Sequence, residues 1–207
     1  VSGDFYWATV KGDYFYLAVC DCTGHGVPGA FMSLLNINYL NEAINEKDIT
    51  EPGKILDHVR AQLIKKLEGS RDGMDAVLVQ LPLKGAMPSK IKYAAANNSV
   101  VLIGKQQVQE LPYDTMPIGL GEKQDSFKTF ECDVAQGDAL YLYTDGYADQ
   151  FGGPRGKKFK YKQLDEILVQ NKEANMQKQR EALLETFDNW RGKLEQVDDV
   201  CVVGIRF

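Results

Sequence analysis

The amino-acid sequence predicts an α+β fold, a sandwich with a mainly antiparallel sheet. Strand-like segments gather at the start and in the middle of the chain instead of alternating with helices, as they would in a doubly wound parallel sheet. Helical patterns occur in two pairs, one after the first two strands and one near the C-terminus. A chain of 207 residues that is 44% hydrophobic can fill one large core. We therefore expect a single domain that spans residues 1–207.

The first third of the chain predicts a hairpin followed by two helices. Aromatic and β-branched residues fill 5–10 and 14–20, and Gly12 lies in the tight turn between these strands. Apolar residues then recur at helical spacing from Val27 to Ile44. A second helix from Pro52 to Leu67 starts with proline in its first turn and repeats its apolar residues every four positions.

The middle of the chain is predicted to be mostly sheet, because short apolar runs there are separated by Gly, Pro and Asn. The expected strands are 76–81, 91–96, 100–103, 127–132 and 139–143. Two helical segments follow at 161–169 and 175–190, before a terminal strand at 200–207.

Composition excludes several classes of function. With 24 Lys and Arg against 29 Asp and Glu, the net charge is -5, so a nucleic-acid partner is not expected. The apolar runs are far shorter than the roughly 20 residues that cross a bilayer. The four cysteines lie in strand-like runs, which favours core packing in a reducing, cytoplasmic compartment. Because the chain has no initiator Met and no signal-like segment, we expect it to begin inside a longer polypeptide.

Acidic residues stand at the ends of several predicted strands. Asp4 opens the first strand, Asp21 closes the second, Asp145 closes the 139–143 strand, and the pair Asp198 and Asp199 opens the last. Any one of them is typical of a turn or a cap. Together they resemble the set of oxygen ligands that a hard divalent cation takes.

The residue types favour magnesium or manganese over zinc. The chain has only two histidines, so a zinc site of imidazole or thiolate ligands is disfavoured. Two carboxylate-bound ions about 3.5–4 Å apart would activate a water and clamp a phosphoryl group. His25 follows Asp21 by four positions and is a candidate proton donor to a departing alkoxide; the alternative is a turn histidine bonded to backbone.

Four motifs resemble those of a known family in their order and spacing. They are Ser2–Tyr6, Asp21–Ser33, Tyr143–Gly146 and Asp198–Val200. They look like the motifs of the metal-dependent serine/threonine phosphatases of the protein phosphatase 2C type, and most closely those of the bacterial SpoIIE-like branch with its RsbU-type regulators. The resemblance implies a four-layer α-β-β-α sandwich of two mainly antiparallel sheets flanked by helices, with two Mn²⁺ or Mg²⁺ ions at one edge.

The resemblance also implies roles for individual residues. The metal ligands would be Asp4, Asp21, the backbone carbonyl of Cys22, Asp145, and Asp198 or in its place Asp199. Asp21 would bridge both ions, and Asp21, Asp145 and the proton donor His25 would carry catalysis. Phosphoserine or phosphothreonine would then be hydrolysed by metal-activated water without a phosphoenzyme.

Family resemblance further implies bacterial signalling. The expected partners are a phosphorylated protein, for example a STAS-domain anti-anti-sigma factor, an upstream sensor domain that could attach the full chain to a membrane, and a second copy in a homodimer. The first arginine is Arg60, so the phosphate-gripping Arg that the eukaryotic branch has near its first motif is missing. The basic, Gly-rich segment 149–158 is either a solvated turn or a flap near the cleft.

Two readings compete with the phosphatase. One is a catalytically silent module of the same fold that binds a phosphoprotein or another partner. The other is a plain α+β interaction domain whose acidic strand ends are turns and caps.

Overall fold

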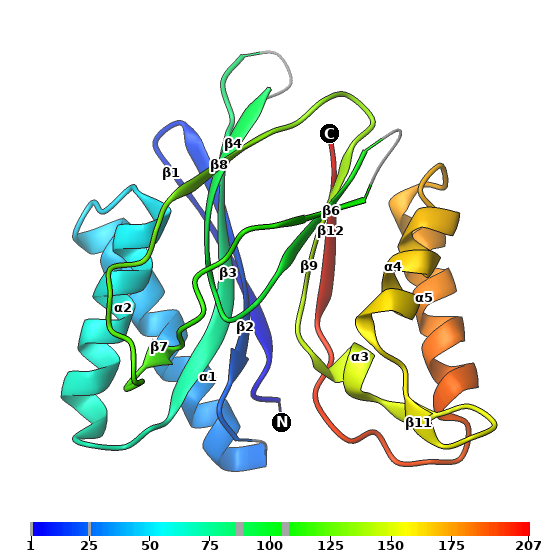
Figure 1. The fold of residues 1–207 in the computed structure, drawn as a ribbon. Coiled ribbons are helices and arrows are strands. Elements are labelled where there is room, and N and C mark those ends of the chain that lie inside the picture. The colour runs from blue at the N-terminus through cyan, green and yellow to red at the C-terminus, as the bar shows by residue number, and fades with distance from the viewer. Residues whose placement is uncertain (1, 25, 86–88, 105–107) are drawn as a thin grey trace.

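The computed structural model describes residues 2–24, 26–85, 89–104 and 108–207. Two sheets face each other, and a pair of helices covers the outer face of each sheet (Figure 1). The predicted α-β-β-α sandwich is thereby confirmed. No helix in the described part of the chain is long and apolar enough to cross a membrane.

The first sheet has the order β1-β2-β3-β4-β8, with β7 paired to β3, and all of its pairs are antiparallel. Its strands are β1 (Phe5–Lys11), β2 (Tyr14–Cys22), β3 (Gly73–Pro82), β4 (Lys90–Ala96), β7 (Ile118–Gly119) and β8 (Phe130–Asp133). The second sheet has the order β12-β9-β5-β6 and is also antiparallel. Its strands are β5 (Val100–Ile103), β6 (Val108–Leu111), β9 (Ala139–Tyr143) and β12 (Val202–Arg206).

Helices complete the two outer layers. The first sheet is covered by α1 (Gly26–Asn41), its π-helical extension η1 (Glu42–Glu46) and α2 (Pro52–Leu67). The second is covered by α4 (Tyr161–Gln170) and α5 (Met176–Arg191). Between β9 and α4 lie a short helix α3 (Gly146–Asp149) and a hairpin of β10 (Phe151–Gly152) and β11 (Lys157–Lys158).

Strand alternation divides the apolar residues among three cores. In β2, Tyr16, Ala18 and Cys20 pack toward α1 and α2, while Leu17 and Val19 pack against the second sheet. Because both faces of the central strands are covered, β2 and β3 are apolar almost throughout. A third core lies between the second sheet and α4 and α5.

Most predicted elements occur near their expected bounds, with differences at short or irregular ones. The strand expected at 127–132 begins only at Phe130, and the first helix continues beyond Ile44 in the π-helical turn. The sequence analysis missed β6, β7, α3, β10 and β11. Strands of two residues are too short to show an alternating pattern, and three of the four residues of β6 are exposed.

This topology brings distant parts of the chain to one edge of the sandwich. The N-terminal segment, the end of β2 and the loop into α3 lie at the lower edge in Figure 1. Residue 5 pairs with residue 20, and residue 202 pairs with residue 143, so the acidic strand ends share this edge.

We expect Leu140→Ala to destabilise the domain by about 2–5 kcal/mol, because this β9 side chain is fully buried between the sheets. Urea denaturation measures the change. Leu184→Ala is the matched control, since Leu184 of α5 is 49% exposed, and it should change stability by only about 0.5 kcal/mol. Equal losses in the two variants would contradict the assigned core.

Candidate active site

The acidic residues predicted to act together are neighbours at this edge. Burial first, and then the charges of Asp4, Asp145, Asp198 and Asp75, together raise the pKa of Asp21 to about 8. No Lys or Arg of the described residues forms an ion pair with Asp4, Asp21, Asp145 or Asp198. The edge therefore concentrates negative charge without a protein cation paired to it.

Asp4 shows most clearly that a carboxylate oxygen of this edge lacks a cation or a hydrogen-bond donor among the described residues. Burial, together with the charges of Asp199 and Asp198, raises the pKa of Asp4 to about 6, although the nearby Thr144 and Asp21 side chains oppose the rise. Its Oδ2 atom is buried and has no hydrogen-bond partner. An unpartnered buried carboxylate oxygen is costly unless a cation or a donor meets it. This atom fits an oxygen-liganded divalent ion.

Asp145 lies where β9 ends and α3 begins. Burial is the largest cause of its raised pKa. The charges of Asp198 and Asp149 add to the rise, and Lys158 opposes it. The Asp145 side chain makes no capping hydrogen bond to α3. Its carboxylate is therefore not committed to the helix end.

Asp198 and Asp199 have different environments. Asp199 Oδ2 accepts a 2.7 Å hydrogen bond from the backbone N–H of Gly3, which ties the N-terminal segment to the loop before β12. Asp198 Oδ1 accepts one from the Asp199 N–H at 2.8 Å. Because Asp199 holds the backbone in place, Asp198 is the freer of the two for an ion.

Glycine allows the backbone segments of this edge to approach one another. A Cβ on Gly146 would lie 1.9 Å from the Asp199 carbonyl oxygen, so no side chain fits where α3 meets the loop before β12. A Cβ on Gly3 would lie 2.6 Å from the Gly24 carbonyl oxygen and 3.1 Å from that of Cys22. The predicted carbonyl ligand of Cys22 thus lies close to the N-terminal segment.

The thiol of Cys22 is not part of the polar edge. It is buried and contacts Asn36 Nδ2 at 3.3 Å, and burial raises its pKa to about 12. Of the polar atoms of Cys22, only the backbone is left for an ion. The predicted proton donor His25 lies outside the described residues.

Asp75 belongs to the same edge, and the sequence analysis missed it. It lies on β3 directly opposite Asp21 in the strand register. Burial, with a smaller contribution from the Asp145 charge, raises the pKa of Asp75 to about 6, although the 3.1 Å hydrogen bond from Asn97 Nδ2 opposes the rise. The signal was present, because Asp75 precedes the predicted strand 76–81 just as Asp4 precedes the first strand.

Two asparagines connect the sheets beside these carboxylates. Asn97 and Asn98 lie in the turn from β4 of the first sheet to β5 of the second, and Asn97 has φ of 52°. Asn97 donates to Asp75, and Asn98 Nδ2 donates to the Tyr143 carbonyl oxygen at 2.8 Å. The turn therefore fixes the end of β9, two residues before Asp145, relative to β3.

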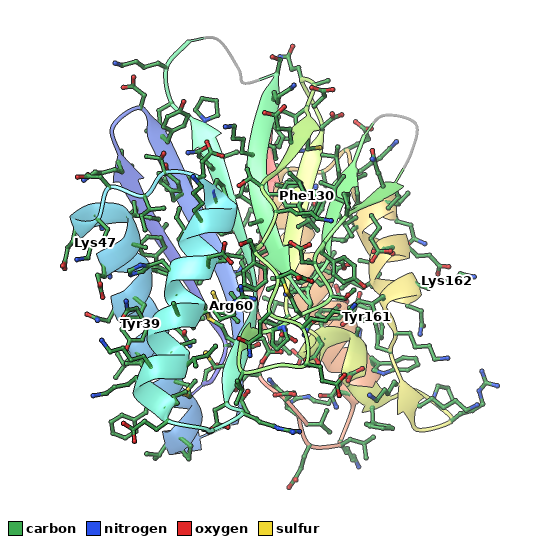
Figure 2. The ribbon with its side chains drawn as sticks, turned by 60° about the vertical axis from the view of Figure 1, so that its left-hand side comes forward. Tyr39, Lys47, Arg60, Phe130, Tyr161 and Lys162 are labelled. Carbon is green, nitrogen blue, oxygen red and sulfur yellow. The ribbon has the colours of Figure 1, made fainter. Side chains whose placement is uncertain are left out.

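The first arginine of the chain does not reach this edge. Arg60 lies on α2 (Figure 2). It is buried, pairs with Asp57 at 2.9 Å and lies over the ring of Phe127 at 4.5 Å. It contributes to the core under α2 and is not available to grip phosphate.

The chemistry of this edge is that of carboxylate and carbonyl oxygens, which suits Mg²⁺ or Mn²⁺. Among the residues that the structure describes, no group of three or more His, Cys, Asp or Glu side chains is arranged to hold an ion as it stands. Side chains of the edge would therefore have to turn toward one another to share an ion.

Comparison with known proteins agrees with this arrangement. The family model described as Stage II sporulation protein E (SpoIIE) matches residues 11–207. This chain belongs to the SpoIIE family. The comparison with curated proteins finds no match.

Solved structures extend the family assignment. The SiaA-PP2C domain of Pseudomonas aeruginosa is similar with a TM-score of 0.90 and 30% identity over 100% of this chain and 81% of that chain. The RsbU and RsbW domains of a Mycobacterium tuberculosis protein match with a TM-score of 0.77 and 21% identity, over 100% and 55% of the two chains. RsbX in complex with magnesium matches with a TM-score of 0.64 and 13% identity, over 99% and 86%. The SpoIIE-family chain is thus a PP2C-like phosphatase domain of the SpoIIE and RsbU type.

We expect metal-free Asp21→Asn to be more stable than wild type at pH 8. The pKa of Asp21 is near 4 in the unfolded chain and about 8 in the folded domain, so stability falls as pH rises between these values. Removing the charge should stabilise by about 1 kcal/mol after allowance for partial exposure, or about 2–4 °C in Tm. Thermal unfolding with chelator from pH 4 to 8 measures this. Asp133→Asn, at an exposed position of β8, is the control. If Asp21→Asn is less stable than wild type at pH 8, the prediction is contradicted.

Asn98→Ala should weaken both stability and Mn²⁺ binding. The change leaves the Tyr143 carbonyl without its donor, at a cost of about 1–3 kcal/mol, and frees the end of β9 that carries Asp145. Denaturation and Mn²⁺ calorimetry measure the two effects. Asn45→Ala, which removes an exposed contact with Asn41, should change neither measurably. Reduced stability with wild-type Mn²⁺ affinity would refute the positioning role.

Proposed function

We propose that this domain hydrolyses phosphoserine and phosphothreonine in proteins by means of two Mn²⁺ or Mg²⁺ ions at the acidic edge. The observation that carries the proposal is the buried, unpartnered Oδ2 of Asp4 among carboxylates that raise one another's pKa and have no ion-paired cation. Bound protons or cations stabilise such an edge, and near neutral pH divalent ions fit its oxygen donors. Family membership supports the same chemistry.

The proposed ligands are those that the family resemblance implies, and the charges at the edge support them. Asp21 lies among the other carboxylates and would be shared by both ions, with the Cys22 carbonyl and Asp4 on one side. Asp145 and Asp198, whose charges act on each other, would hold the second ion. Bound ions would supply a water nucleophile of lowered pKa and positive charge for the phosphoryl group.

The chain's own residues orient this edge. Thr144 Oγ1 accepts from the Cys201 N–H at 2.9 Å, and its backbone N–H donates to the Cys201 carbonyl at 3.0 Å, which joins β9 to the start of β12. This pairing keeps Asp145, which follows β9, near the loop before β12 that carries Asp198. The proton donor for the leaving serine remains a prediction for His25.

The biological setting is part of the same proposal. We infer that the domain is the output module of a longer, cytoplasmic sensor protein, or one attached to a membrane through another domain, and that it acts on a phosphorylated protein such as a STAS-domain anti-anti-sigma factor. Support comes from the RsbU type of the family and from a similar chain that contains RsbU and RsbW domains. A homodimer is the assembly that we expect of such a module.

A phosphoserine peptide assay with and without Mn²⁺ tests the function. Asp145→Asn keeps the shape of the side chain but removes its charge, so we expect hydrolysis to fall by more than about 100-fold, the upper end of what changes outside the metal ligands cost. Asp13→Asn is the matched control, because Asp13 lies in the β1–β2 turn and pairs with Lys84.

The outcomes of this assay separate the phosphatase from the two competing interpretations. Metal-dependent hydrolysis that Asp145→Asn abolishes and Asp13→Asn retains would support the phosphatase. Saturable Mn²⁺ binding without hydrolysis would point to the silent binding module, and neither binding nor hydrolysis would refute a metal-dependent function.

A further inference from the structure

A basic groove lies beside the acidic edge, on the hairpin that the sequence analysis left open between a turn and a flap. Its volume is about 470 Å³, and Arg155, Lys157, Lys158 and Lys160 line it together with Trp190. Four cations within six residues are unusual in a chain whose net charge is -5. The groove therefore offers a local positive field on an acidic protein.

Most of this charge is unpaired. Lys158 Nζ binds Asp149 at 2.7 Å, and of the described residues no carboxylate forms an ion pair with Arg155, Lys157 or Lys160. All four cations are exposed. Three cations that share one groove repel one another unless an anion joins them.

The groove has a fixed backbone. The N–H of Gly153 donates to the Trp190 carbonyl at 2.8 Å, and the indole N–H of Trp190 donates to the Gln150 carbonyl at 3.0 Å. A Cβ on Gly152 would lie 2.0 Å from the Trp190 carbonyl oxygen, so the hairpin lies directly on α5. The basic side chains thus project from a hairpin anchored to the domain.

Lys160 has a backbone conformation that a lysine rarely adopts. Its φ of 77° and ψ of 147° lie in a region that is almost exclusive to glycine. Its N–H donates to the Ala148 carbonyl at 2.6 Å, and its carbonyl accepts from Gln163 N–H at 3.1 Å, which hold it there. Residues kept in such strain cluster at functional sites, and here the strained residue carries one of the unpaired charges.

The groove adjoins the acidic edge. Asp149, the partner of Lys158, ends the short helix that begins next to Asp145, and Lys158 opposes the rise that burial and Asp198 cause in the pKa of Asp145. Tyr161 follows Lys160 and stacks on Tyr143 with ring centroids 5.9 Å apart. Figure 2 shows Tyr161 against the strands, whereas the next residue, Lys162, extends away from the domain.

We propose that this groove binds carboxylate side chains of the substrate protein that flank its phosphorylated residue, so that the domain selects acidic phosphorylation sites. The inference rests on the proposed phosphatase function. An extended peptide whose phosphoserine lies at the acidic edge passes the adjoining groove, and three unpaired cations match two or three Asp or Glu side chains. Nucleic acid does not fit, because the chain has a net charge of -5 and four groove cations are too few to follow a continuous phosphate backbone.

Two phosphoserine peptides test the selection, one with Glu at three flanking positions and one with Gln at the same positions. With Mn²⁺, wild type should hydrolyse the Glu peptide with about tenfold higher kcat/KM, mainly through KM, since three exposed charge pairs that each contribute about twofold multiply to about that factor. The preference should fall as salt rises. The variant Arg155→Gln/Lys157→Gln/Lys160→Gln should lose the preference but hydrolyse p-nitrophenyl phosphate, which has no flanks, at the wild-type rate.

A control of equal charge change is Lys162→Gln/Lys178→Gln/Lys193→Gln, at exposed positions outside the groove, and it should keep the preference. Lys160→Gly separates binding from folding, because glycine relieves the strain at φ of 77°. This variant should be at least as stable as wild type and still lose part of the preference.

Three outcomes would overturn the inference. Equal kcat/KM for both peptides in wild type would show no flank selection, and an equal fall with p-nitrophenyl phosphate would place the cations on the phosphoryl group itself. If no phosphate is hydrolysed at all, the proposed function fails. Fluorescence anisotropy of a labelled, unphosphorylated Glu peptide then tests whether the groove binds acidic peptides. Binding that the groove variant loses and the control keeps would support it; absence of binding to wild type would refute it.

Discussion

Mutual repulsion of desolvated carboxylates is the constraint on which the edge of this sandwich depends. Burial and neighbouring charges together raise the pKa of Asp21 to about 8 and of Asp4 to about 6, so ionisation of this edge opposes folding near neutral pH. Three extensive cores supply the stability that offsets this cost. An edge that destabilises its own fold is typical of sites where function requires a ligand, here a cation, to complete it.

The contacts around the edge hold the carboxylates at their positions despite this repulsion. Gly146 lets α3 approach the loop before β12, and Asp199 fastens the N-terminal segment through Gly3. The turn of Asn97 and Asn98 links the two sheets at the same level. These contacts are made by backbone groups, asparagine amides and the Asp199 carboxylate, and none of them introduces a cation that would compete with a bound ion.

Sequence periodicity predicted most strands and helices and the carboxylates at their ends for one physical reason, whereas the four-layer arrangement came from the family resemblance. Long buried strands and amphipathic helices have strong periodic patterns, and Asp4, Asp21 and Asp145 interrupt those patterns at their ends. Asp75 also stands before a predicted strand and was overlooked there, but its place opposite Asp21 depends on strand register, a non-local relation that periodicity does not encode. The β10–β11 hairpin was missed because two-residue strands show no alternation, and what holds the hairpin is Trp190, more than thirty residues away in the chain.

The acidic edge and the basic groove lie next to each other but keep their opposite charges apart. Were the groove's cations at the acidic edge, they would pair with its carboxylates and displace a divalent ion, so the two sets have to be adjacent but separate. The Lys158–Asp149 pair stands at the boundary and neutralises the charges that face each other there. The strained Lys160 turns the chain from β11 into α4, with the groove on one side and the Tyr161 ring stacked on Tyr143 on the other. A phosphorylated segment with acidic neighbours is the ligand whose own charges match both surfaces, since ions at the edge would attract its phosphate and the groove its carboxylates.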